Sequence, residues 1–247
     1  MIDQDQIELI RQALLECGKA FDAAELFPTV VPEAAGLVVS DPYAFSIATC
    51  LDRKTKADII WTIPYDIKNL LGHLDPYGIY QMSLEELAEM FARLPRKPRF
   101  KNDAPRTVME LTKIIVEEYG GHAEMIWEGK NSDQVKKNFD SVYGVGVGIA
   151  NMAVLLIEKA FPYRFSDLDR PSMDIKSDTH TRRVLYRLGV SEAETDKAAI
   201  VAARLINPAY PGEIDGVLWL IGRTWCHPIN PDCQNCCMTK VCAKRID

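Results

Sequence analysis

Five of the seven cysteines in this 247-residue chain lie close together near its C-terminus. They are Cys226, Cys233, Cys236, Cys237 and Cys242. Without Cys237 the spacing is Cys-x6-Cys-x2-Cys-x5-Cys, and four thiolates this close can surround one zinc ion or one iron–sulfur cluster. Zinc ribbons usually carry two separated Cys-x-x-Cys pairs, whereas this segment has one. The spacing therefore predicts a metal centre, in which Cys237 competes with its neighbour Cys236 for the place of the third ligand.

The two remaining cysteines, Cys17 and Cys50, stand alone in apolar helical segments. Cysteine in such a setting usually serves as a small buried hydrophobe. Clustered cysteines in an intracellular chain bind metal more often than they form disulfides. We therefore predict metal binding for the C-terminal group and core packing for Cys17 and Cys50.

A glycine-rich turn, VYGVGVGIAN, occupies residues 142–151 between two helical segments. Gly144 and Gly146 permit a tight turn with positive φ and a close backbone approach. The first N–H groups of the following helix lack internal partners and, with the helix dipole, suit a phosphate. Ala150 allows the paired helices to approach closely. A lone Gly-x-Gly also fits a helix–helix turn without a ligand, but a dinucleotide loop would require a preceding strand, and none is predicted.

The two motifs together resemble the endonuclease III-like family of helix-hairpin-helix DNA glycosylases. The turn matches the hairpin pattern h-x-G-h-G-x-x-x-A, and the segment GRTWC at 222–226 resembles the sequence before the family's first cluster ligand. The resemblance runs from Asp41 to the C-terminus and is strongest over 142–242. It implies a [4Fe–4S] cluster on Cys226, Cys233, Cys236 and Cys242, with Cys237 as a neighbouring free thiol. It also implies DNA contacts at Gly144, Gly146 and Gly148.

The resemblance further assigns a catalytic role to Asp178. The segment SDTHTRRV at 177–184 matches an Asp-Thr-His run whose aspartate is catalytic in the family. An ionised carboxylate would stabilise the oxocarbenium character at C1′ of an extruded nucleotide and activate the attacking water. Aspartate at such a position also commonly caps the next helix, and both roles are compatible. We expect His180 to be structural.

The sequence departs from the family pattern at the position of its catalytic lysine. Bifunctional members carry that lysine four residues after the first hairpin glycine, where it forms a Schiff base with C1′. This chain has Gly148 there, which also enlarges the floor of the base pocket. We therefore predict a monofunctional glycosylase in which Asp178 activates water. The alternative is a bifunctional glycosylase/AP lyase with a relocated lysine, for which Lys176 is the candidate.

A second departure concerns the residue that fills the gap left by the flipped base. The segment ATCLDR at 48–53 stands where the family has a glutamine-bearing stretch, and it contains no glutamine. We expect Leu51 to act as an apolar wedge and Arg53 or Lys54 to touch the opposite base or the backbone.

Helical periodicity dominates the elements that must position these residues. We predict Asp41 as an N-cap with Pro42 at the first helical position, and a capping box from Ser83 to Glu86. The predicted helices are 7–21, 42–50, 84–94, 106–119, 133–142, 149–161, 179–188, 196–206 and 216–225. Since no convincing alternating strand is present, the expected fold class is all-α.

The resemblance implies two lobes. Residues 36–165 would form a six-helix barrel lobe that carries the helix-hairpin-helix. Residues 1–35 and 166–247 would form the iron–sulfur cluster lobe from the N-terminal and C-terminal helices. The long polar loop 162–177 would connect them.

The net charge of −6 opposes DNA binding if taken alone, because phosphate contacts need a positive surface. Basic residues are nevertheless concentrated over 93–106, 130–137, 176–187 and 223–245, and their distribution matters more than the sum. No apolar run approaches the ~20 residues of a membrane span, and the N-terminus reads as an amphipathic helix rather than a signal peptide. We expect a cytoplasmic, nucleoid-associated monomer whose partner is double-stranded DNA with a damaged or mismatched base.

The leading hypothesis is therefore base-excision repair by hydrolysis of an N-glycosidic bond. A non-catalytic DNA-binding homologue is the other alternative, since the lysine and glutamine are missing. The target base stays open among uracil or thymine in mismatches, alkylated purines and oxidised pyrimidines. Adenine opposite oxidised guanine is disfavoured because that specialised group carries a further C-terminal domain.

Overall fold

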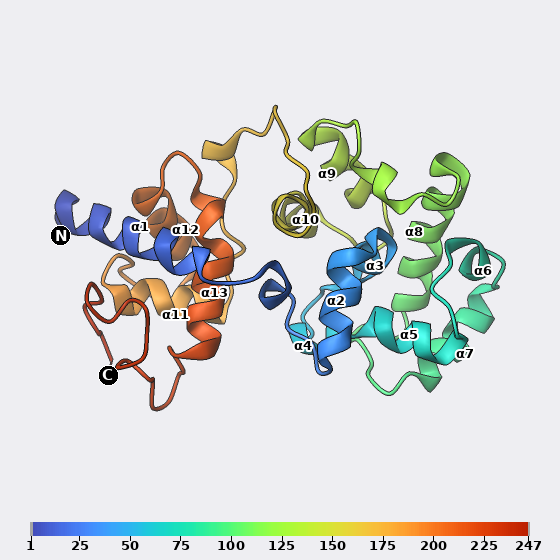
Figure 1. The fold of residues 1–247 in the computed structure, drawn as a ribbon, viewed down its shortest axis with the longest axis horizontal. Coiled ribbons are helices and arrows are strands. Elements are labelled where there is room, and N and C mark those ends of the chain that lie inside the picture. The colour runs from blue at the N-terminus through green and yellow to red at the C-terminus, as the bar shows by residue number, and fades with distance from the viewer. Residues whose placement is uncertain (1, 247) are drawn as a thin grey trace. The chain divides into compact units, whose positions relative to one another are not determined.

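The computed structural model describes residues 2–246, which form helices and no strands (Figure 1). The α-helices are α1 (Gln4–Lys19), α2 (Pro32–Ser40), α3 (Pro42–Leu51), α4 (Ala57–Ile60), α5 (Ile63–Leu71), α6 (Pro76–Tyr80), α7 (Leu84–Arg93), α8 (Ala104–Tyr119), α9 (Ser132–Asp140), α10 (Val147–Ala160), α11 (Thr179–Leu188), α12 (Asp196–Ile206) and α13 (Asp215–Thr224). Short 3-10 turns are η1 (Ala23–Leu26), η2 (Ala123–Ile126), η3 (Arg170–Ser172) and η4 (Pro211–Ile214). The all-α prediction is confirmed.

The chain divides into two compact units. The terminal unit comprises Met1–Asp22 and Asp169–Asp247, and the central unit comprises Ala23–Leu168. Residues 23–35, expected in the cluster lobe, belong to the central unit instead, because α2 packs on α3, α5 and η1 of that unit. The later boundary falls inside the loop 162–177.

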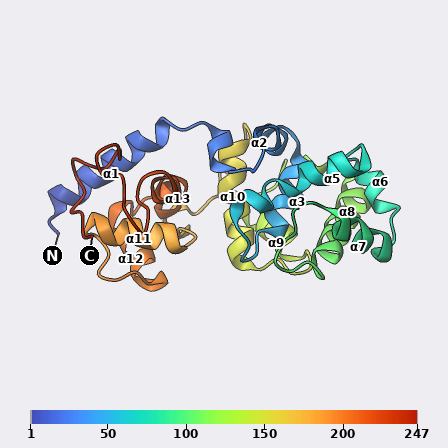
Figure 2. The ribbon, with the colours of Figure 1, turned by 90° about the horizontal axis from the view of Figure 1, so that it is seen from below.

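The terminal unit has one apolar core, built from α1, α11, α12 and α13. The inward faces of these helices meet at fully buried residues, among them Ile10, Leu14, Leu185, Ala203 and Leu218. The side-by-side arrangement of α1 with the C-terminal helices is visible in Figure 2. Residues from the two ends of the chain therefore share one core, and α11 lies at its centre, packed on both α12 and α13.

The core of the central unit is rich in aromatic rings. Phe45 lies in edge-to-face contact with Phe27, Trp127 and Phe161, and Phe27 packs on Trp61 at 4.6 Å between ring centroids. Such T-shaped pairs add about 0.5–1.5 kcal/mol each beyond area burial. These rings join α3 to the segments before and after it.

Local capping signals are confirmed where the sequence predicted them. The Asp41 carboxylate accepts from the backbone N–H groups of Tyr43 and Ala44, with Pro42 in the first turn of α3. Ser83 and Glu86 form the capping box of α7, and Gly120 ends α8 with φ +59°. Among residues 2–246 no single helix has the length and apolar composition of a membrane span, and α2 with α3 meets that test only as a pair bent by 109°.

Candidate active site and metal centre

Asp178 is the N-cap residue of α11. Its Oδ1 accepts hydrogen bonds from the backbone N–H groups of His180 (2.8 Å) and Thr181 (2.9 Å), and the Thr181 hydroxyl accepts from the Asp178 N–H at 2.9 Å. This capping box holds the side chain at the positive end of the helix dipole, where a negative charge is stabilised. Both carboxylate bonds go to Oδ1, which leaves Oδ2 without a hydrogen-bond partner among the described residues.

His180 serves the packing of α11 on α13. A side-chain carbon at Gly222 would lie 2.6 Å from the His180 Cβ, so only glycine permits this approach. The imidazole Nδ1 lies 3.2 Å from Arg183 Nη2, and the ring meets Trp219 edge-on at 6.3 Å. These contacts are structural and place α13 directly against the residues that follow Asp178.

Two inward arginines, one turn apart on α11, hold the start of the cysteine segment. Arg183 donates from Nε to the Cys226 carbonyl (2.7 Å) and from Nη2 to the Gly222 carbonyl (2.9 Å). Arg187 donates to the carbonyls of His227 (2.6 Å) and Pro228 (3.1 Å). Both guanidinium side chains are nearly buried, at 7% and 9% exposure. One helix therefore carries Asp178 at its start and fixes the cysteine segment along its length.

The four spaced cysteines, Cys226, Cys233, Cys236 and Cys242, line one cavity together with apolar residues such as Ile221 and Met238. All four are free thiols. Burial raises the pKa of the Cys236 and Cys242 thiols, and the neighbouring cysteines raise it further. Burial therefore favours the uncharged form of these two thiols.

The donor chemistry of this cavity suits a thiolate-bound centre. Four cysteines line it together, and thiolates are ligands of both zinc and iron–sulfur clusters. A lone zinc ion would draw four sulfur atoms to about 2.3 Å from one point, whereas a cluster keeps its thiolates farther apart because several iron atoms lie between them.

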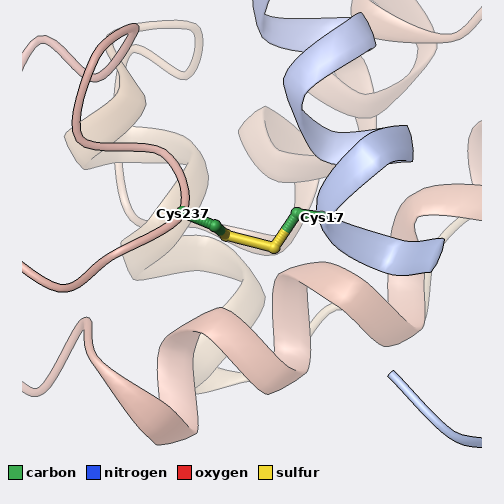
Figure 3. The surroundings of a disulfide bond; sticks show 2 residues. All are labelled: Cys17 and Cys237. Atoms are coloured by element: carbon green, nitrogen blue, oxygen red, sulfur yellow. A yellow bond between two sulfur atoms is a disulfide. The ribbon is translucent and has the colours of Figure 1, made fainter. Parts of the chain in front are cut away.

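The structure corrects the prediction for Cys17 and Cys237. Cys237 was expected to be a free thiol and Cys17 a plain core residue, but the two form a disulfide. Figure 3 shows the bond between α1 and the C-terminal loop. The pairing also removes Cys237 as a competitor of Cys236 for the metal. Cys50 is fully buried in the central unit, as expected.

The glycine turn joins α9 to α10 as a hairpin. The Val145 N–H donates to the Val142 carbonyl at 3.0 Å, with Gly144 at φ +79° inside this turn. Gly146 is the N-cap of α10, and no side chain caps the helix. The first N–H groups of a helix have no internal partners, and Val147 in the first turn of α10 is 69% exposed. Ala150 is buried at the contact of the two helices.

Arg53 contacts the hairpin rather than projecting from the surface. It donates from Nη2 to the Thr107 hydroxyl (2.9 Å), which in turn donates to the Tyr143 carbonyl (3.0 Å). A Cβ at Gly144 would lie 2.6 Å from Arg53 Cζ. Leu51, predicted as a wedge, is only 1% exposed. That prediction is wrong because α3 is buried along its whole length.

Gly148 lies in the first turn of α10. A Cβ built there meets no atom within 4 Å, and the backbone φ is not in the left-handed region. A larger side chain would therefore fit at this position without displacing a neighbour.

Sequence reasoning missed Arg183, Arg187 and the structural role of Arg53. A usable signal existed for the first two. Arginines spaced by four residues on the apolar side of α11, among Val184, Leu185 and Leu188, require buried acceptors. The carbonyls of the cysteine segment supply them.

Comparisons with known proteins agree with this fold. No family model matches the chain. An endonuclease III of Thermotoga maritima is 24% identical over 204 residues, which cover 82% of this chain and 83% of that protein.

Solved structures give the same answer. A trapped endonuclease III–DNA covalent intermediate has a TM-score of 0.60 and 19% identity, covering 99% of this chain and 97% of its own. A thermostable thymine-DNA glycosylase has a TM-score of 0.59 and 18% identity, covering 97% and 96%. A non-covalent endonuclease III–DNA complex also has a TM-score of 0.59, at 17% identity with 99% and 97% covered.

The chain therefore has the fold of the helix-hairpin-helix DNA glycosylases. Its sequence is similar to that of an endonuclease III, and the resemblance expected from the motifs is confirmed.

Proposed function

We propose that this protein is a DNA glycosylase of base-excision repair that hydrolyses the N-glycosidic bond of a damaged or mismatched base. One observation carries the proposal. Asp178 is fixed at the start of α11 through Oδ1 alone, so Oδ2 is available for chemistry. Helix capping alone would also explain this geometry. The similarity to endonuclease III and the presence of the hairpin support DNA as the substrate on which the free oxygen acts.

The chemistry follows from the charge. As the bond from C1′ to the base breaks, C1′ becomes cationic, and an ionised carboxylate beside it stabilises the transition state. The same carboxylate orients a water molecule and accepts its proton. The capping bonds hold the carboxylate in one orientation, so little reorganisation is needed when the charge develops at C1′.

The hairpin is the proposed phosphate contact. The uncapped N–H groups at the start of α10, between Gly146 and Gly148, can donate to a DNA phosphate. Because Gly146 has no side chain, the backbone can come close to the strand. Duplex DNA is accordingly the proposed partner of a monomeric, cytoplasmic protein.

We propose a [4Fe–4S] cluster on Cys226, Cys233, Cys236 and Cys242. The cluster would supply a structural cross-link that fixes the C-terminal segment on α11. Arg183 and Arg187 already hold the backbone around Cys226, His227 and Pro228. Their positive charges lie beside the thiolates, and Arg187 Nη1 is 3.5 Å from Cys226 Sγ.

The proposal is monofunctional, with water as the nucleophile, because Gly148 offers no amine. The bifunctional alternative relies on Lys176, which is exposed and lies two residues before Asp178. Borohydride treatment with abasic duplex DNA separates the two, since only a Schiff base gives a covalent adduct.

The deciding experiment is base release from a panel of lesion duplexes containing uracil, mismatched thymine, alkylated purines and oxidised pyrimidines. Asp178→Asn is the control, because asparagine caps a helix as well as aspartate and removes only the charge. We expect release from at least one duplex by the native protein and not by the variant. Release from no duplex would support a non-catalytic DNA-binding role instead.

A further inference from the structure

The disulfide between Cys17 and Cys237 connects the two ends of the chain inside the terminal unit. Its residues are separated by 220 positions, with Cα atoms 6.1 Å apart. Cys17 lies in the last turn of α1 and is 7% exposed. Cys237 is exposed and directly follows Cys236, one of the four cavity cysteines. The bond therefore fastens α1 to the cysteine segment at the residue next to a proposed ligand.

Two weaker contacts accompany this bond. Gln6 Nε2 donates to the Val241 carbonyl at 2.9 Å, next to Cys242. The Phe21 ring lies 6.2 Å from that of Trp225, next to Cys226. Thus α1 and the residues just after it contact the cysteine segment near three of its four cavity cysteines, and the contact at Cys237 is covalent.

The two sulfur atoms differ in access. A thiolate can reach the sulfur of the exposed Cys237, whereas Cys17 is shielded by α1 and the core. Attack at Cys237 would form a mixed disulfide there and release Cys17 as a thiolate, which takes up a proton. A second thiol then attacks the mixed disulfide and releases Cys237, so two electrons from two external thiols reduce one protein disulfide.

We propose that Cys17 and Cys237 form a redox-sensitive lock, opened by dithiols, that controls how firmly the cysteine segment holds its centre. With the lock closed, the segment is tied to α1 covalently. With the lock open, the segment is held to the N-terminal helix by non-covalent contacts alone, among them the Gln6 hydrogen bond and the Phe21 ring contact, and local opening of the segment becomes easier. The effect of the lock on metal retention rests on the proposed cluster, whereas the thiol–disulfide exchange itself does not.

The first test counts thiols in the aerobically purified full chain. After denaturation, iodoacetamide should label five of the seven cysteines without reductant and all seven after dithiothreitol. The peptides containing Cys17 and Cys237 should gain the two extra labels. Labelling of all seven without reductant would overturn the proposal.

The second test measures release of iron to a chelator under nitrogen, followed by visible absorbance. Native protein treated with dithiothreitol and then desalted should lose iron about tenfold faster than untreated protein, because the loop-closing constraint is gone. The variant Cys17→Ala/Cys237→Ser should lose iron at the fast rate with or without treatment, which controls for direct effects of the reductant. Equal rates in treated and untreated native protein would overturn the lock.

A third test compares the Tm of oxidised and reduced protein, and it requires neither a bound cluster nor glycosylase activity. If the purified protein holds no iron, the cluster proposal fails, yet reduction should still lower the Tm of the native chain and leave that of the double variant unchanged. An identical Tm for oxidised and reduced native protein would refute the lock by itself.

Discussion

Replacing Gly144 by alanine should damage the hairpin, whereas the same change at Gly146 should spare the fold and damage only DNA binding. Gly144 has φ +79°, and its added Cβ would lie 2.6 Å from Arg53 Cζ. The left-handed conformation costs a non-glycine residue about 1–2 kcal/mol. Displacing Arg53 would also break its hydrogen bond to Thr107, worth about 1 kcal/mol.

Together these two effects should lower the free energy of unfolding of Gly144→Ala by about 2–3 kcal/mol, which corresponds to a fall in the Tm of the central unit of roughly 4–12 °C. Gly146 has φ −132° and ψ 173°, which alanine adopts freely, and its Cβ would meet no atom within 4 Å. Its cost as an N-cap change is below about 1 kcal/mol.

Thermal unfolding and binding to an abasic-site duplex at fixed salt measure the two effects separately. Gly146→Ala should weaken binding by roughly 10–100-fold, because its methyl group would hold a phosphate away from the N–H donors of α10 at a loss of about 1.5–3 kcal/mol. Equal loss of Tm in both variants would refute the Arg53 contact. Native binding by Gly146→Ala would refute the hairpin as the phosphate site.

Two further predictions concern the departures from the family pattern and the cysteines. Gly148→Lys should fold normally, because a Cβ there meets no neighbour. The variant should form a borohydride-trapped adduct with abasic DNA that the native chain does not form. Absence of the adduct would show that position 148 does not face C1′. Cys233→Ser should abolish the visible absorbance and reduce the bound iron from about four atoms per chain, while Cys50→Ala, in the other unit, should leave both unchanged. Full iron content in Cys233→Ser would exclude that residue as a ligand.

The sequence predicted the elements whose signals are local. The helix bounds of α11 and α12 are those expected, since Asp178 and Thr195 cap the starts and Gly189 ends the first. By contrast, α2 was missed because its N-cap, Val31, offers no side-chain hydrogen bond. Contacts with α3 and α5 hold it, and tertiary packing of this kind leaves little local trace.

In the candidate site, too, the features with local sequence signals were predicted and those that depend on tertiary contacts were missed. The glycine turn and the cysteine spacing are contiguous motifs, so they could be found from the sequence. The pairing of Cys17 with Cys237 depends on the approach of segments far apart in the chain, which no spacing rule reveals. Arg53 was expected to touch the opposite base or the DNA backbone, but its guanidinium donates to Thr107 beside the hairpin, a contact between segments far apart in the chain.

The central claim is that the negative charge of Asp178 drives base release. Its most direct test is the single-turnover rate of release on a duplex that the native protein processes, compared between the native chain and Asp178→Asn at equal, saturating enzyme. The predicted result is a loss of at least about 100-fold with Tm unchanged, since asparagine preserves the cap on His180 and Thr181. Equal rates for the two proteins would contradict the account.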